Sequence, residues 1–214
     1  MTGKEPEDEG CSEDFENVFM NWPTIGLSAE SEHRFPRITW GIRMAGATAV
    51  LIGGFWLGAW LGGWAAPWSA AGAITVKTNM ALGQLLAGIA LLLAGIAASH
   101  LRRAGATGLA ALVLLIGALP LSQHFFGLEL GIDQLLAREA PGAAATARPN
   151  RMGPPGSLSL ALLGAGLLAL AWGRRRMVPY LGLAVCLISL MPAVGFLYGI
   201  KGFYSLPSVT GIAW

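Results

Sequence analysis

Charged residues are scarce in this sequence: they make up 12% of its 214 residues, while hydrophobic residues make up 54%. A typical water-soluble domain carries about 25% charged residues, so this composition excludes an ordinary soluble domain. Because so many apolar side chains need an apolar solvent, the composition indicates a protein embedded in a lipid bilayer.

Acidic residues are almost absent after residue 32. Nine of the twelve stand at or before that point: Glu5, Glu7, Asp8, Glu9, Glu13, Asp14, Glu16, Glu30 and Glu32. The formal net charge of +2 is therefore an average over an acidic tail and a basic remainder. No basic face interleaved with aromatic residues is found, so a nucleic-acid partner is not expected. The composition of the tail is typical of disorder, and binding to a basic cytoplasmic partner is the alternative.

Cysteine pairs and catalytic motifs are also lacking. Cys11 stands in the acidic tail and Cys186 in an apolar run, which argues against a disulfide or a shared metal site. A haem between His33 and His100 would need both to point into one cavity of a bundle, but both stand at the boundaries of apolar runs. With no nucleotide-binding loop, kinase motif or pair of catalytic carboxylates, the sequence predicts no enzyme, no cofactor and no metal site.

Five apolar runs approach the length of about 20 residues that a membrane-spanning helix needs. They cover residues 44–64, 80–99, 104–121, 157–173 and 178–200, and the third and fourth are short. None alternates polar and apolar residues as a half-buried strand does. We therefore predict an all-α integral membrane fold with about five transmembrane helices. The expected domains are an acidic cytoplasmic tail over residues 1–38 and a helical transmembrane domain over residues 39–214.

Basic residues in the short connections predict the orientation, because lysine and arginine favour the cytoplasmic side. Eight of the fourteen fall on one side of the predicted membrane: Arg34, Arg37, Arg43, Arg102, Arg103, Arg174, Arg175 and Arg176. The N-terminus is therefore expected inside and the C-terminus outside, with an outer loop over residues 122–156. An interfacial aromatic belt is expected at the outer end of the first helix, formed by Trp56, Trp60, Trp64 and Trp68.

The four later runs resemble one another in pairs. Residues 79–88 open the second helix much as residues 155–164 open the fourth, and an arginine turn follows each of these helices. Residues 125–128 and 197–200 then end each pair with an aromatic residue and a glycine. The pattern predicts a parallel repeat of two helical hairpins, helices 2–3 and 4–5, rather than the inverted repeat of many transporters.

The polar helix start at residues 79–83, the arginine turn and the loop segment 126–136 (FGLELGIDQLL) resemble the N-terminal membrane region of bacterial sensor proteins. In that family the membrane region precedes PAS, histidine-kinase or diguanylate-cyclase modules. The resemblance covers roughly residue 76 to the C-terminus. The second repeat departs from it, because Pro154, Pro155 and Gly156 stand where the family usually has Pro-Asn-Thr.

The resemblance implies a signal-receiving module in the bacterial inner membrane, with its output domain absent from this chain. It also implies a sixth transmembrane helix after Trp214, since five crossings would leave the C-terminus outside. The alternative is a small stand-alone membrane protein that serves as an assembly subunit or a minor transporter component. Ionisable residues are missing from the middle of the five runs, which argues against an ion or proton pathway.

Three residues in or beside the predicted outer loop form the candidate signal-sensing site: His124, Asp133 and Gln134. A lone histidine or carboxylate is more often simply solvated, and this reading stays open beside the functional one. In the loop we expect an ordered half over residues 126–136 and a mobile half over residues 140–150.

Small and polar residues within the helices suggest packing contacts. Gly54, Gly58 and Gly62 share one face of the first helix, where another helix could approach closely, either within the chain or in a homodimer. Gln84, early in the second helix, is expected to bridge neighbouring helices through a hydrogen bond.

Overall fold

The computed structural model describes residues 36–95, 99–143, 146 and 148–199. The expectations for the acidic tail, for His33 and for a sixth helix concern residues outside this described part. Regular structure within it is helical throughout. The expected all-α fold is therefore confirmed for the described residues.

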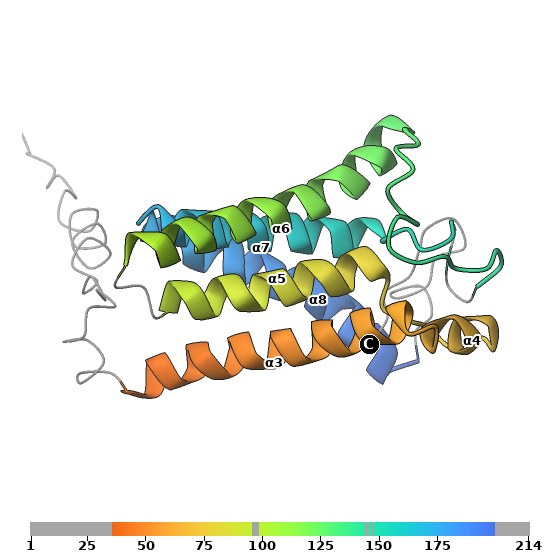
Figure 1. Cartoon of the computed structure of the whole chain (residues 1–214), viewed down its shortest axis with the longest axis horizontal. Coiled ribbons are helices and arrows are strands. Elements are labelled where there is room, and N and C mark those ends of the chain that lie inside the picture. Colours follow the sequence, from red (N-terminus) through yellow and green to blue (C-terminus); the bar gives the residue numbers. More distant parts are fainter. Residues whose placement is uncertain (1–35, 96–98, 144–145, 147, 200–214) are drawn as a thin grey trace, which may run out of the picture. The chain divides into compact units, whose positions relative to one another are not determined.

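Six α-helices and one 3₁₀ helix follow one another along the described residues (Figure 1). They are α3 (Pro36–Leu61), α4 (Ala65–Ala70), α5 (Thr78–Gly95), α6 (His100–Phe126), α7 (Pro154–Ala171), η1 (Arg175–Met177) and α8 (Val178–Leu197). Five of them, α3, α5, α6, α7 and α8, are long and apolar enough to cross a membrane. By length and composition, the chain is a multi-span membrane protein.

The third long helix extends well beyond the apolar run at residues 104–121. α6 has 27 residues, because it begins at His100, before the run, and continues through the polar residues 122–124 to Phe126. At its start, the Ser99 side chain accepts a hydrogen bond from the Arg102 N–H and caps the helix. At its end, Gly127 has a left-handed φ of +64°, a conformation that glycine adopts without strain. The connection to α7, here called the long loop, is therefore residues 127–153 rather than 122–156.

Proline residues mark the starts of the last two long helices. Pro154 and Pro155 occupy the first turn of α7, where a missing backbone N–H costs nothing. Pro179 lies in the first turn of α8, where proline is likewise tolerated. Pro192 lies inside α8, where proline removes a backbone hydrogen bond and is expected to kink the helix.

Glycine residues bring the helix backbones into contact. A Cβ atom added at Gly53 of α3 would lie only 2.5 Å from the Leu85 backbone nitrogen of α5. One added at Gly164 of α7 would lie 2.4 Å from the Leu114 backbone nitrogen of α6. Neither position has room for a side chain. Such close approach is the means by which helices associate in lipid, where the hydrophobic effect gives little help.

The buried core lies where α5, α6 and α7 pack against one another, and α8 packs against α7. Its fully enclosed members are mostly small or aliphatic: Ala87, Ala90, Ala110, Val113, Met152, Leu160 and Leu167. In Figure 1, α3, α5, α6 and α7 run lengthwise, with α4 and the long loop at one end. We call the end that holds α4 and the long loop the loop end. The opposite end, where α6 begins and α7 ends, is called the far end. The hairpins α5–α6 and α7–α8 are present, while their relation as a repeat stays a prediction.

Candidate functional site

Every carboxylate that follows residue 32 lies in the long loop, and each one forms an ion pair. The pairs are Lys77–Glu139, Arg151–Asp133 and Arg148–Glu129. The first two are buried, whereas the third is exposed to solvent. Only Lys77–Glu139 joins the long loop to a residue outside it, and the other two pairs lie within the loop.

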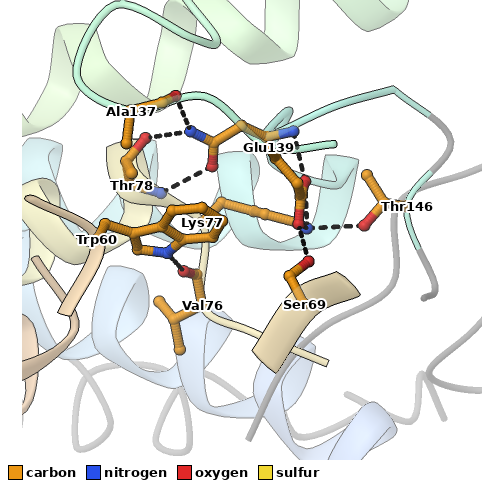
Figure 2. Close-up of polar contacts among 9 residues, drawn as sticks. Trp60, Ser69, Val76, Lys77, Thr78, Ala137, Glu139 and Thr146 are labelled. Carbon is orange, nitrogen blue, oxygen red and sulfur yellow. Dashed lines mark hydrogen bonds and ion pairs between the residues drawn. The ribbon is translucent and has the colours of Figure 1, made fainter. Parts of the chain in front are cut away.

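Glu139 is the centre of the first buried pair, and Figure 2 shows the polar side chains that converge on it. Lys77 Nζ lies 2.7 Å from Glu139 Oε1 and 2.8 Å from Oε2. The Ser69 hydroxyl, from α4, donates to Oε1 at 2.6 Å, and the Asn150 backbone N–H donates to Oε2 at 2.6 Å. Lys77 Nζ also donates to Thr146 Oγ1 at 2.7 Å. Glu139 thus joins α4, the start of α5 and both halves of the long loop.

Burial of the Lys77 ammonium group in this site is unfavourable, because the charge loses its contact with water. Loss of water lowers the pKa of Lys77 from its ordinary value of 10.5, although the hydrogen bond and charge of Glu139 raise it in part. Lys77 precedes α5 and stands outside the candidate transmembrane helices. A buried ammonium group needs a carboxylate partner with close geometry, so the site depends on Glu139 remaining in place.

Asn150 caps the start of α5 from a distant part of the chain. Its side-chain Oδ1 accepts a hydrogen bond from the Thr78 backbone N–H at 3.1 Å. Its Nδ2 donates to Thr78 Oγ1 at 2.7 Å and to the Ala137 carbonyl at 2.9 Å. The first N–H groups of a helix have no partner within the helix, and here the loop supplies one. Asn150 is completely buried and has a positive φ of 55°, which asparagine tolerates better than most residues.

The second buried pair lies within the long loop and contacts α6 through Gln123. Arg151 Nε lies 2.8 Å from Asp133 Oδ2, and the same oxygen accepts a hydrogen bond from Gln123 Nε2 at 3.3 Å. The neighbouring carbonyl of Ile132 accepts from Asn79 Nδ2 of α5, also at 3.3 Å. Among the described residues, Asp133 Oδ1 and Gln123 Oε1 are buried without a hydrogen-bond partner. One short loop segment thus contacts two of the candidate transmembrane helices.

The three residues predicted for the sensing site have different environments. Asp133 is buried in its ion pair and is not solvated. His124 Nε2 lies 2.8 Å from the Met152 carbonyl at the end of the long loop. Gln134 is exposed. The partners of Asp133 and His124, Arg151 and Met152, are adjacent in the chain, whereas Gln134 lies at the surface.

The close contact of α3 with α5 lies at Gly46 and Gly53 rather than on the predicted face. A Cβ atom at Gly54 would meet only Leu85 Cδ1, at 3.9 Å, and one at Gly58 would meet nothing within 4 Å. A Cβ atom at Gly62, which follows the last residue of α3, would lie 3.0 Å from the Gly58 carbonyl of that helix. Homodimer formation through this face stays a prediction.

Gln84 lines a groove between helices, and the bridging hydrogen bond expected of it does not form within the described residues. Trp60 also differs from its expected place in an interfacial belt, because it is buried and donates its indole N–H to the Val76 carbonyl at 2.7 Å. Trp64 and Trp68 are exposed, as members of such a belt would be. A buried tryptophan needs a partner for its N–H, and Val76 supplies it.

Sequence reasoning missed most of the polar residues at the loop end: Lys77, Gln123, Glu139, Asn150 and Arg151. The signal that would have found them is the placement of carboxylates. Three fall within residues 129–139 of a region that otherwise has none, and carboxylates beside a membrane are expected to have basic partners. Comparison with known proteins adds no relative, since no family model, no curated protein and no solved structure matches this chain.

Proposed function

We propose that this chain is the membrane-embedded signal-receiving module of a bacterial sensory protein, with its output domain outside the sequence. The observation that carries the proposal is the attachment of the long loop to the helices through buried polar bonds. The loop contains residues 127–136, which are all but the first residue of the segment 126–136 that most resembles bacterial sensor proteins. In the proposed orientation, the loop end faces the outside of the inner membrane, because the arginine-rich connections lie at the far end.

The buried bonds give the loop a physical means of acting on the helices. Asp133 and Ile132 contact α6 and α5 through Gln123 and Asn79. A ligand that prefers one arrangement of the loop would shift the population of the helix arrangement that goes with it. At the far end, Arg103 of α6 donates to the Ala171 carbonyl of α7 at 2.8 Å. A movement of α6 would therefore also displace α7, at the end nearest the proposed output domain.

The test is a distance measurement between spin labels at the far end. Labels at Leu101 and Met177, which are both exposed, would report the separation of the start of α6 from the start of α8 in the full chain. Cys11 and Cys186 would first be replaced by serine and alanine. Breaking the buried pair with Arg151→Gln should shift this distance by about 1–2 Å, the scale of helix shifts in switching proteins.

The matched control is Arg148→Gln, which breaks the exposed pair of the same loop and should leave the distance unchanged. Helical circular dichroism would show that each variant is folded. If the Arg151 variant is folded and the distance at its far end does not change, the loop does not transmit a change to the helices. The alternative function as an assembly subunit is then favoured.

A further inference from the structure

A groove lies along the helical body, apart from the buried ion pairs of the loop end. It is bounded by α3, α5, α7 and α8 and has a volume of about 360 Å³. This volume is within the range of small-molecule sites, roughly 300–1,000 Å³. Its walls are apolar side chains and glycine, with three exceptions: Gln84, Ser159 and Ser189.

These three polar residues stand at a similar depth on three different helices. A Cβ atom at Gly83 of α5 would meet the Leu160 side chain of α7, so Gln84 and Ser159 lie level with each other. α8 runs back along α7, and a Cβ atom at Gly166 would lie 3.7 Å from Leu181. Because both helices rise about 1.5 Å per residue, Ser189 lies about level with Ser159. The groove therefore has a polar part toward the loop end.

The rest of the groove is lined by apolar side chains and extends toward the far end. It is lined there by Leu91 of α5, Leu170 of α7 and Val178 of α8. Val178 is the first residue of α8 and Leu170 is next to the last residue of α7, so this part reaches nearly the full length of the helices. The groove is thus polar at one end and apolar along its length.

Two polar residues of the groove have no hydrogen-bond partner among the residues that the structure describes. Ser159 is 9% exposed, yet its hydroxyl makes no hydrogen bond among the described residues, and the same holds for the Gln84 amide. Polar groups in apolar surroundings are costly unless they are hydrogen-bonded. The Ser159 hydroxyl and the Gln84 amide can each both donate and accept, so a bound molecule could satisfy them in either role.

The lack of charged side chains in the groove limits which molecules can bind there. None of the residues that line the groove is ionisable. A carboxylate, phosphate or ammonium head would be left there without a counter-charge, which is strongly unfavourable in an apolar site. The fitting head is therefore neutral, and a hydroxyl or carbonyl oxygen matches the donors and acceptors present.

We propose that the groove binds a neutral, single-chain amphiphile from the bilayer, with its hydroxyl or carbonyl head at Gln84, Ser159 and Ser189. Its hydrocarbon chain lies along α7 and α8 toward the far end. This binding does not depend on the proposed signalling function, since it can be measured on the chain by itself.

The experiment uses 1-dodecanol that carries a photoreactive diazirine, added to the full chain in phospholipid nanodiscs. Labelling of α7 and α8 should saturate, and unmodified 1-dodecanol should compete with it. Dodecane at the same mole fraction in the bilayer should compete about five- to ten-fold less well, because it lacks the hydrogen-bonding head. Dodecanoate, when ionised, should also compete poorly.

Two kinds of variant test the geometry. In the double variant Gln84→Leu with Ser159→Ala, dodecanol and dodecane should compete equally well with the labelled probe. In Ser159→Ala alone, dodecanol should still compete better than dodecane, but by a smaller factor than in the wild type. Gly182→Phe should abolish labelling, because Gly182 lines the groove and its Cβ position is open. Gly108→Phe is the matched control, since its Cβ position is equally open and Gly108 does not line the groove.

Three results would overturn the proposal: labelling that does not saturate, dodecane that competes as well as dodecanol, or unchanged labelling in folded Gly182→Phe. Any of them would mean that the groove is filled by bulk lipid chains without selection. Helical circular dichroism on each variant separates these outcomes from misfolding.

Discussion

The loop end and the helical body of this protein bury side chains of opposite kinds. In the body, the buried side chains are small and apolar, such as Ala87, Ala110 and Val113, and helix backbones touch at glycines. At the loop end, Lys77 and Glu139 are buried instead, in a network of short hydrogen bonds. Removing one partner of a buried ion pair leaves an uncompensated buried charge and costs about 3–5 kcal/mol, whereas adding a methylene to a packed apolar core costs about 1–3 kcal/mol. The difference favours the loop end as the place where a signal could act.

The largest effect should come from removing one member of a buried ion pair. Glu139→Leu leaves the Lys77 ammonium buried without a counter-charge, and the free energy of unfolding should fall by about 3–5 kcal/mol. The measurement is loss of helical circular dichroism as sodium dodecyl sulfate is added to the protein in mild detergent micelles.

Two further variants sharpen this result. Adding Lys77→Met to Glu139→Leu removes the orphaned charge and should restore part of the lost stability. Glu129→Gln breaks the exposed pair with Arg148 and should change the free energy of unfolding by no more than about 1 kcal/mol. Equal losses for Glu139→Leu and Glu129→Gln would show that burial does not distinguish the two pairs.

A smaller effect is expected from adding one methyl group in the helical body. Gly53→Ala would place its Cβ 2.5 Å from the Leu85 backbone nitrogen, so α3 and α5 must separate, at a cost of about 1–3 kcal/mol. Gly58→Ala is the control, because nothing lies within 4 Å of its Cβ position. It should be neutral or slightly stabilising, since alanine favours a helix interior over glycine. The same detergent titration would measure both, and a Gly53 variant as stable as the wild type would contradict the backbone contact.

The smallest of the three effects separates two roles of Asn150. Asn150→Gly removes its bonds to Thr78 and Ala137 but tolerates the positive φ. Asn150→Ala removes the same bonds and adds backbone strain of about 1–2 kcal/mol. The alanine variant should therefore be the less stable by that amount. Hydrogen exchange of the amides at the start of α5 should rise in both, and unchanged exchange would mean that Asn150 does not cap the helix.

The composition of the apolar runs was enough to predict the fold class and five helices, because a bilayer restricts the spanning structures to very few. The ends of α6 were harder, since residues 122–124 are polar yet continue the helix. Two of these polar side chains, Gln123 and His124, form hydrogen bonds to the long loop. Polarity alone therefore marks the end of an apolar run and not the end of a helix.

The candidate site was predicted only in part, because its members meet through the fold. Asp133 stood out in the sequence, but Arg151, its partner, could not be chosen over Arg138 or Arg148 by position alone. Asn150 caps a helix that begins at Thr78, and no local pattern shows a cap from so far along the chain. The glycines of α3 show the same limit, since Gly53 meets α5 while its neighbour Gly54 barely does.

The receiving role proposed for the long loop depends most on which side of the membrane holds the loop end. A receiving surface must face the signal, and the arginine-rich far end must face the cytoplasm. A reporter that is active only in the cytoplasm should be active when fused after Arg103 or Arg176. The same reporter fused near Ala143, in the long loop, should be inactive, and a reporter active only outside the membrane should give the opposite pattern. Cytoplasmic activity at Ala143, with none after Arg103 and Arg176, would contradict the orientation and the receiving role proposed for the long loop.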